Sequence, residues 1–205
     1  DNFKKFINFL SKFFESNDQP VSSLLKQKIP ILERYTIYAA HCVEPARKTI
    51  TEIYDVDVLT LNDIKERFSL PSVDFMSLDV EGMELEVLKS GKTIVSDCLG
   101  ISIDADIVST REGDGNFVDI CVWMRDEGFE LFDIPKVVRV GYAGSRITDP
   151  RHEIGKETVR RYGRLYGCDA LFLKDPLNPE SNSQDMTSGQ FLKLACIAEI
   201  YNQIE

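Results

Sequence analysis

The most informative absence in this sequence is glycine in its first 81 residues. All 12 glycines lie at or after Gly82. Nucleotide-binding α/β folds usually carry a glycine-rich turn after their first strand, because the backbone must approach the cofactor closely. Any cofactor bound by this chain would therefore lack its usual backbone cradle in the segment before Gly82.

Other shortages exclude further classes of protein. No stretch approaches the roughly 20 apolar residues that a membrane-spanning helix needs, and no signal-peptide pattern is present. Net charge is −10, which argues against general nucleic-acid binding, since that depends on neutralising phosphates. The 205 residues suffice for one domain with its own core, and we predict a single domain.

Cysteine is sparse and irregularly spaced. The five cysteines are Cys42, Cys98, Cys121, Cys168 and Cys196. They form no C-x-x-C pair, so the pattern predicts reduced, mostly buried thiols of a cytoplasmic protein and no metal site.

The stretch around which the chain is organised runs from Val73 to Leu88. Its apolar first part, residues 73–78, is typical of a strand covered on both faces. Asp79 ends that run, Glu81 and Gly82 form a turn, and a leucine-bearing helix follows. Ligands of open α/β sheets bind beyond the carboxyl ends of strands, so both carboxylates are candidate functional groups. The alternative is that they only stabilise the start of the helix electrostatically.

The string VDFMSLDVEGMELEVLKSG, residues 73–91, resembles the signature D-V-E-G-x-E segment of FkbM-type methyltransferases. Residues 56–64 (VDVLTLNDI) and 163–175 (GRLYGCDALFLKD) are similar to flanking strands of that family, so the likeness spans about 56–175. The resemblance implies an S-adenosylmethionine-dependent O-methyltransferase. It also implies a Rossmann-like sheet that is mostly parallel, has an antiparallel last strand and carries helices on both faces. The family's D-x-G-A-N-x-G loop is missing, so the sheet is expected to be incomplete at its N-terminus.

Four acidic residues have candidate roles in such a site. Asp79 is the best-placed carboxylate for orienting and deprotonating an acceptor hydroxyl or for contacting the donor's ammonium group, and Glu81 is second. Asp104 ends another apolar run and could line the cofactor pocket; alternatively it faces solvent. Glu44 could hold the cofactor's ribose, although a surface acid before a proline is the simpler interpretation. Nothing in the sequence specifies a metal.

Periodicity predicts the remaining elements. Residues 1–20 are expected to contain an amphipathic helix docked on the core, with attachment to a membrane surface as the alternative. A short helix is expected from Ser22, broken by Pro30, and residues 109–115 form a polar loop that could act as a lid. The expected strands are 35–43, 56–61, 73–78, 99–104, 129–134 and 170–173, and the expected later helices are 62–68, 117–126 and 189–205, the last also a possible homodimer contact.

A basic segment lies between the last two predicted strands. Residues 135–167 contain eight arginines and lysines and three acids, a local charge of +5 in a chain of −10. Arginine binds anionic groups bidentately, so Arg160, Arg161 and Arg164 are predicted to contact an acceptor such as an anionic glycan. The alternative is a solvated helix whose charges pair internally.

Two functional hypotheses follow. The first is an O-methyltransferase that acts on a glycan or a related hydroxylated metabolite. The second is a non-catalytic methyltransferase-like domain that binds a partner or glycan without a complete donor site.

Overall fold

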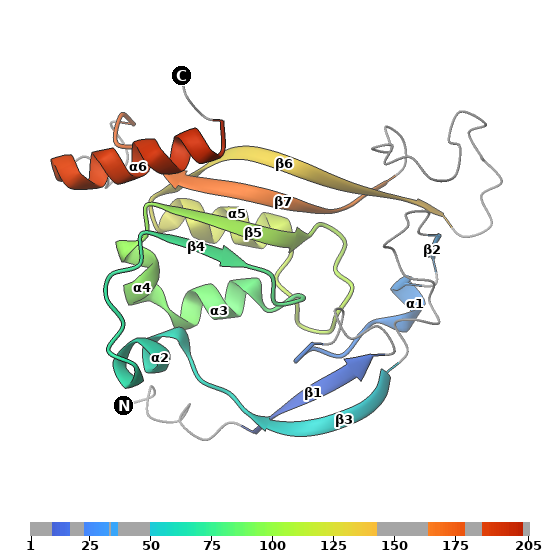
Figure 1. Ribbon diagram of the computed structural model, residues 1–205. Helices are drawn as coiled ribbons and strands as arrows, with labels where there is room; N and C mark the ends of the chain where they lie inside the picture. Colours follow the sequence, from blue (N-terminus) through green and yellow to red (C-terminus); the bar gives the residue numbers. More distant parts are fainter. Residues whose placement is uncertain are drawn as a thin grey trace.

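The computed structural model describes residues 10–16, 23–32, 34–36, 50–142, 164–178 and 186–202 (Figure 1). The fold is mixed α/β, with a five-stranded sheet of order β2-β6-β7-β5-β4. Its strands are β2 (Tyr35–Thr36), β4 (Phe75–Leu78), β5 (Gly100–Asp106), β6 (Phe129–Tyr142) and β7 (Arg164–Lys174). A separate two-stranded ribbon pairs β1 (Leu10–Ser16) with β3 (Ile50–Asp57).

The large sheet is parallel only at its β4–β5 edge. There the chain returns through α3 (Glu84–Ser90) and α4 (Lys92–Asp97), the kind of crossover that parallel strands require. β7 lies between β5 and β6 and runs antiparallel to both, so the predicted antiparallel last strand is confirmed. The expected excess of parallel pairs is not found among the described strands, because β7 makes two antiparallel pairings and β2 adds a third to β6. A complete Rossmann-like sheet stays a prediction.

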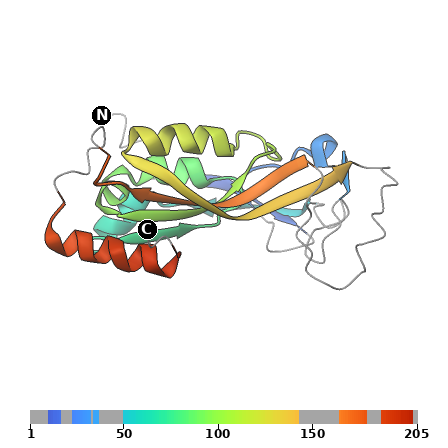
Figure 2. The same cartoon turned by 90° about the horizontal axis from the view of Figure 1, so that it is seen from above.

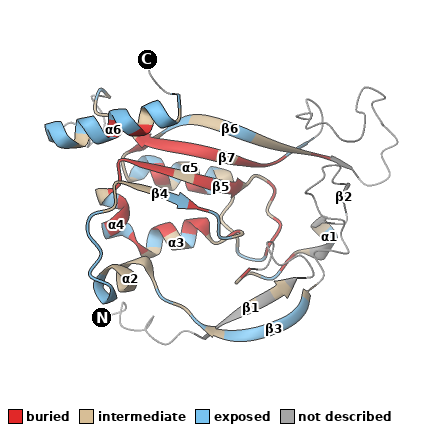
Figure 3. Cartoon of the chain, viewed as in Figure 1, coloured by how far each residue is buried: buried red, intermediate tan, exposed pale blue. Residues whose placement is uncertain are grey.

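Helices cover both faces of the sheet, as predicted (Figure 2). On one face α3, α4 and α5 (Phe117–Asp126) bury an apolar cluster that includes Leu88, Ile103 and Phe172. On the other face α6 (Ser188–Ile200) packs Leu194 and Ile197 against β7. Figure 3 shows that burial is concentrated in β5 and β7, the inner strands that are apolar on both faces.

Three helices begin at capping boxes, in which a side chain satisfies backbone N–H groups that have no partner within the helix. Their N-cap residues are Thr60, Asn116 and Thr187. The helix predicted at 62–68 is therefore α2 (Leu61–Arg67), and its N-cap is Thr60, with Asp63 completing the box. The preceding strand ends at Asp57 and not at residue 61 as predicted.

The amphipathic helix predicted within residues 1–20 is wrong where the structure describes it. Residues 10–16 form β1, which pairs antiparallel with β3 from Leu10 opposite Asp57 to Ser16 opposite Ile50. The apolar spacing suits a helix, but distant backbone pairing overrides that local preference. The helix predicted from Ser22 is also wrong over its described residues 23–28, which contain no helix; α1 (Ile29–Leu32) begins later and contains Pro30 in its first turn, where proline is tolerated.

Two further expectations need correction. The long connection predicted at 135–167 is partly a β-ribbon, because β6 continues to Tyr142 and β7 begins at Arg164. Glycine at a helix end commonly has positive φ; Gly91 does end α3 as its C-cap, but its φ is −120° and it lies between α3 and α4. A glycine is needed there because a Cβ atom would lie 2.5 Å from Leu61 Cβ.

Two expectations drawn from composition concern membrane-spanning helices and the state of the cysteines. No helix among the described residues is long and apolar enough to cross a membrane. The four cysteines in the described ranges are free thiols, of which Cys98 and Cys168 are buried and Cys196 is exposed. Cys42 lies outside these ranges.

Candidate active site

The turn after β4 is the centre of the candidate site. Asp79 directly follows the strand and is exposed. Glu81 (φ +54°) and Gly82 (φ +99°) both adopt left-handed conformations, which glycine tolerates and other residues rarely adopt. A Cβ atom on Gly82 would also lie 3.0 Å from Arg111 Cδ. Both its conformation and its neighbour therefore require glycine at this position.

Glu84 holds this turn from the first residue of α3. Its carboxylate accepts hydrogen bonds from the backbone N–H groups of Val80 (3.0 Å) and Gly82 (3.0 and 3.2 Å). The residue is only 2% exposed, and burial raises its pKa against the opposing effect of these backbone hydrogen bonds. Sequence reasoning gave Glu84 no role, although an acid at a helix start directly after a glycine turn is a usable signal.

Arg111 is the functional residue that sequence reasoning missed most clearly. It lies in the polar loop after β5 but is only 3% exposed. Its Nη2 donates to Glu81 Oε2, and its Nη1 donates to Asp106 Oδ2 at 3.0 Å. The guanidinium thus connects the turn after β4 to the end of β5. A loop rich in polar residues and glycine gave no sign that its arginine is buried.

The loop that carries Arg111 is itself held by Asp114. The Asp114 carboxylate accepts from the backbone N–H groups of Thr110 (2.8 Å) and Arg111 (2.9 Å) and from Ser109 Oγ (2.5 Å). Through Arg111 the loop contacts the end of β5 and the turn after β4; its motion as a lid stays a prediction.

Residues 23–28 dock on the same turn and loop. Ser23 Oγ donates to the backbone oxygen of Glu81 at 2.8 Å. Further along, the backbone of 26–28 pairs with the loop: Lys28 N donates to Thr110 O at 2.8 Å, and Glu112 N donates to Lys26 O at 2.7 Å. Segments from three distant parts of the chain therefore meet at Glu81 and Arg111.

Asp79 and Asp104 are brought together by strand register. Leu78 pairs with Ile103, so Asp79 and Asp104 occupy the next positions of adjacent parallel strands. Asp104 lies opposite Asp169 of β7, and Asp169 lies opposite Lys136 of β6, with Lys136 Nζ 3.4 Å from Asp169 Oδ1. The three aspartates Asp79, Asp104 and Asp169 thus form a row of carboxylates across the sheet, called the carboxylate row below, at the carboxyl ends of β4 and β5.

The row perturbs the titration of Asp104. Desolvation, followed by the like charges of Asp169 and Asp79, raises the pKa of Asp104 to about 6, although its side chain reaches the surface. A carboxylate that changes charge near neutral pH is suited to proton exchange or to binding a cation.

The other predicted site residues are distributed as follows. Glu81 lies beside Asp79 in sequence, but its carboxylate is paired with Arg111. Arg164 is exposed at the start of β7, three residues beyond the last pairing of β7 with β5 at Gly167. It therefore lies on the β6–β7 extension past the carboxyl ends of β4 and β5 (Figures 1 and 2). Glu44, Arg160 and Arg161 lie outside the described residues.

Comparison with known proteins supports the assignment suggested by the signature turn. A family model described as the methyltransferase FkbM domain matches residues 16–131, more than half of the chain. This match begins upstream of the segment 56–175 that the sequence likeness indicated, and it includes β3, β4, β5 and the Arg111 loop. No curated protein and no solved structure matches the chain. The chain belongs to the FkbM methyltransferase family.

Proposed function

We propose that this chain is an S-adenosylmethionine-dependent O-methyltransferase that acts on a hydroxyl of a glycan or related metabolite. One observation carries the proposal beyond family membership: the two conspicuous carboxylates of the signature turn have different surroundings. Glu81 is paired with buried Arg111, whereas no hydrogen bond or ion pair with another described residue engages exposed Asp79. Asp79 is therefore the carboxylate available for chemistry.

The residues of the carboxylate row fit parts of such a donor. S-adenosylmethionine has a cationic ammonium group and ribose hydroxyls, and ionised carboxylates bind both kinds of group through charge-assisted hydrogen bonds. Asp79 and Asp104 would hold these groups at the exposed ends of β4 and β5. When bound, the cofactor supplies an electrophilic methyl group.

The chain's own contribution is positioning and proton removal. An acceptor hydroxyl that donates to an Asp79 oxygen is oriented for in-line attack, and the same oxygen receives its proton. Glu84 fixes the turn that follows Asp79, and Arg111 pairs with the nearby Glu81 carboxylate. The site thus presents one reactive carboxylate in a fixed place.

A non-catalytic, methyltransferase-like binding domain is the second candidate. The observation that favours it is the absence of glycine before Gly82, which leaves no glycine-rich backbone cradle in that part of the chain.

Calorimetric titration with S-adenosylhomocysteine separates these candidates. We expect binding by the wild-type chain and a loss of about 10-fold or more in Asp79→Asn, because a hydrogen bond to a charged group contributes about 1.5–3 kcal/mol. Asp126→Asn is the matched control, since Asp126 is a similarly exposed aspartate on α5. A folded chain that binds no S-adenosylhomocysteine would refute the enzyme and favour the second candidate; methyl transfer to a glycan panel then tests the acceptor.

A further inference from the structure

The side of α6 that faces away from the sheet is apolar and exposed. Leu192 and Ile200 are 68% and 75% exposed, and Figure 3 shows the helix as largely exposed. Only two of its 13 residues carry a charge. A surface helix normally places charged and polar residues opposite its buried stripe, and a helix that is apolar all round is normally buried. The outward side of α6 is therefore suited to contact with another molecule.

Helical geometry gathers these exposed residues on one face. With 3.6 residues per turn, Leu192 and Ile200 lie within about 40° of Cys196, one on each side of it. The buried Leu194 and Ile197 lie about 160° and 100° away from Cys196 around the helix axis. The outward face of α6 is thus centred near the exposed Cys196, with a large apolar side chain about one turn before it and another about one turn after it.

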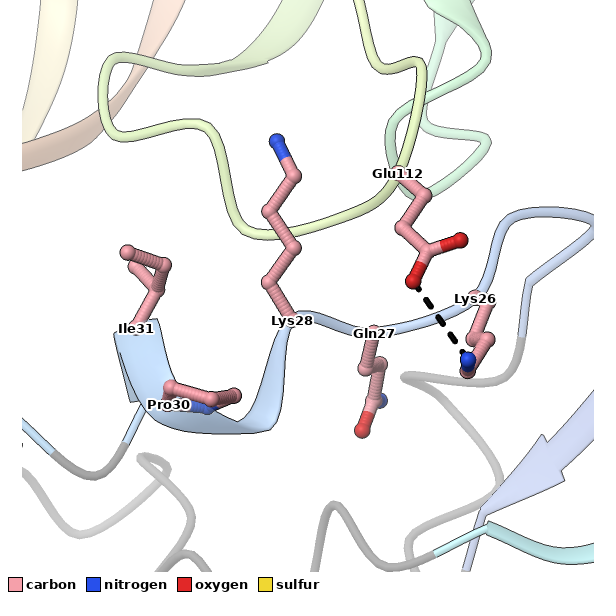
Figure 4. A pocket seen from close by; sticks show the side chains of 6 residues that line it. All are labelled: Lys26, Gln27, Lys28, Pro30, Ile31 and Glu112. Atoms are coloured by element: carbon pink, nitrogen blue, oxygen red, sulfur yellow. Dashed lines mark ion pairs between the residues drawn. The ribbon is translucent and has the colours of Figure 1, made fainter.

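Two other exposed surfaces of the described chain hold paired charges instead. The pocket at the segment that docks on the Arg111 loop is open to solvent, and there Lys26 Nζ lies 3.4 Å from Glu112 Oε1 (Figure 4). On α3, Lys89 Nζ lies 2.8 Å from Glu86 Oε1. Such surfaces remain well solvated in water, whereas the apolar side chains of α6 gain free energy when they leave water.

We propose that α6 pairs antiparallel with α6 of a second copy of this chain, about a two-fold axis near Cys196. Such an axis brings residues that lie equally far from Cys196, in opposite directions along the chain, to the same level. Leu192 of one copy then lies level with Ile200 of the other, so the large apolar side chains cover each other. The pairing goes beyond the proposed function and does not depend on it.

The two charges of α6 favour a second copy in this orientation. Lys193 of one copy lies level with Glu199 of the other, whereas a parallel pairing would place Glu199 beside Glu199 and repel. Lys193 also pairs with Asp74 of its own chain at 2.8 Å but remains 53% exposed, so its ammonium group can contact both carboxylates. The face carries no net charge, and two chains of net charge −10 can therefore meet there without a local excess of like charge.

The small residue at the axis permits close approach. Because paired helix axes lie about 8–10 Å apart and Cα atoms lie about 2.3 Å from each axis, the two Cys196 Cα atoms would be roughly 5 Å apart. A disulfide bond joins Cα atoms about 4.4–6.8 Å apart, so the two thiols can report the contact.

Sedimentation equilibrium of the purified chain tests the association. One 13-residue helix offers less than the about 800 Å² per partner of a standard interface, so we expect a micromolar Kd and, at about 100 μM protein, a mass near twice 23.3 kDa. Leu192→Glu should weaken association by about 10-fold or more, because it buries an unpaired carboxylate in the contact. Val118→Glu is the matched control, since Val118 is 63% exposed but lies on α5. Neither variant should change the melting temperature.

Cross-linking tests the orientation. Copper–phenanthroline with dissolved oxygen takes two electrons from a pair of thiols, which release two protons and form the S–S bond. We expect a covalent dimer of the wild type that is lost in Cys196→Ser. Gly189→Cys in the Cys196→Ser background should not cross-link, because antiparallel pairing places the two new thiols about 21 Å apart along the helices.

Three results would overturn the proposal. The first is a wild-type chain that stays monomeric, as expected if a different protein or a lipid surface covers α6. The second is a Leu192→Glu chain that folds and associates as tightly as the wild type. The third is cross-linking through Gly189→Cys with none through Cys196, which a parallel pairing would give.

Discussion

Replacing Arg111 by methionine tests the buried clamp between the turn after β4 and the end of β5. The arginine side chain is 4% exposed, while the side chains of its partners Glu81 and Asp106 are 27% and 19% exposed. Methionine fills much of the space of the aliphatic stem but leaves both carboxylates without this cation. We therefore expect a large loss of folding stability from a single loop residue.

The magnitude follows from the burial of the three groups. Removing one partner of a buried ion pair costs about 3–5 kcal/mol. Because both carboxylates remain partly solvated, the lower end applies, and we expect about 3 kcal/mol. For a chain of this size each kcal/mol shifts the melting temperature by about 2–4 °C, so the melting temperature should fall by about 6–12 °C.

Urea unfolding and thermal melting followed by circular dichroism measure this effect. Arg125→Met is the matched control, since Arg125 is 74% exposed and its Nε lies 3.9 Å from Asp126; we expect it to cost less than about 0.5 kcal/mol. Glu81→Gln in both backgrounds completes a double-mutant cycle, with an expected coupling of about 1 kcal/mol or more. An Arg111→Met loss no larger than that of the control, or zero coupling to Glu81, would refute the clamp.

Three other perturbations probe the same region. Because the folded-state pKa of Asp104 is about 6, above its ordinary value, stability is lost as the pH rises from that ordinary value to about 6. Asp104→Asn should therefore be more stable than wild type at pH 7.5 by up to about 1 kcal/mol after allowance for solvent screening, and urea unfolding at about pH 3, where the carboxyl is protonated in both states, should show no difference. Glu84→Ala removes the acceptor of two turn N–H groups and should cost about 2 kcal/mol in urea unfolding, with hydrogen exchange faster at Val80 and Gly82; unchanged exchange there would contradict its role. Gly91→Ala places a Cβ 2.5 Å from Leu61 Cβ and should cost about 1–3 kcal/mol, whereas Gly189→Ala, with no contact nearer than 4.0 Å, should cost nothing.

Local features of the site could be predicted from sequence because they depend on neighbouring residues. The apolar run 73–78, the acid that ends it and the glycine turn place β4, Asp79 and Gly82 correctly. The helices α5 and α6 were also predicted close to their observed bounds, since an amphipathic or apolar pattern with a polar cap determines where a helix starts.

Tertiary structure alone decided the contacts between distant segments. Residues 10–16 have helical spacing but form a strand, because β3 offers them backbone partners about 40 residues away. The pKa of Asp104 is raised because the fold desolvates the side chain and because strand register places the like charges of Asp169 and Asp79 beside it. Arg111 looks solvated in its polar loop, and it is buried because Glu81 and Asp106 meet there from two strand ends. Periodicity and capping act over one or two turns of chain, whereas burial and charge pairing depend on which segments the fold brings together.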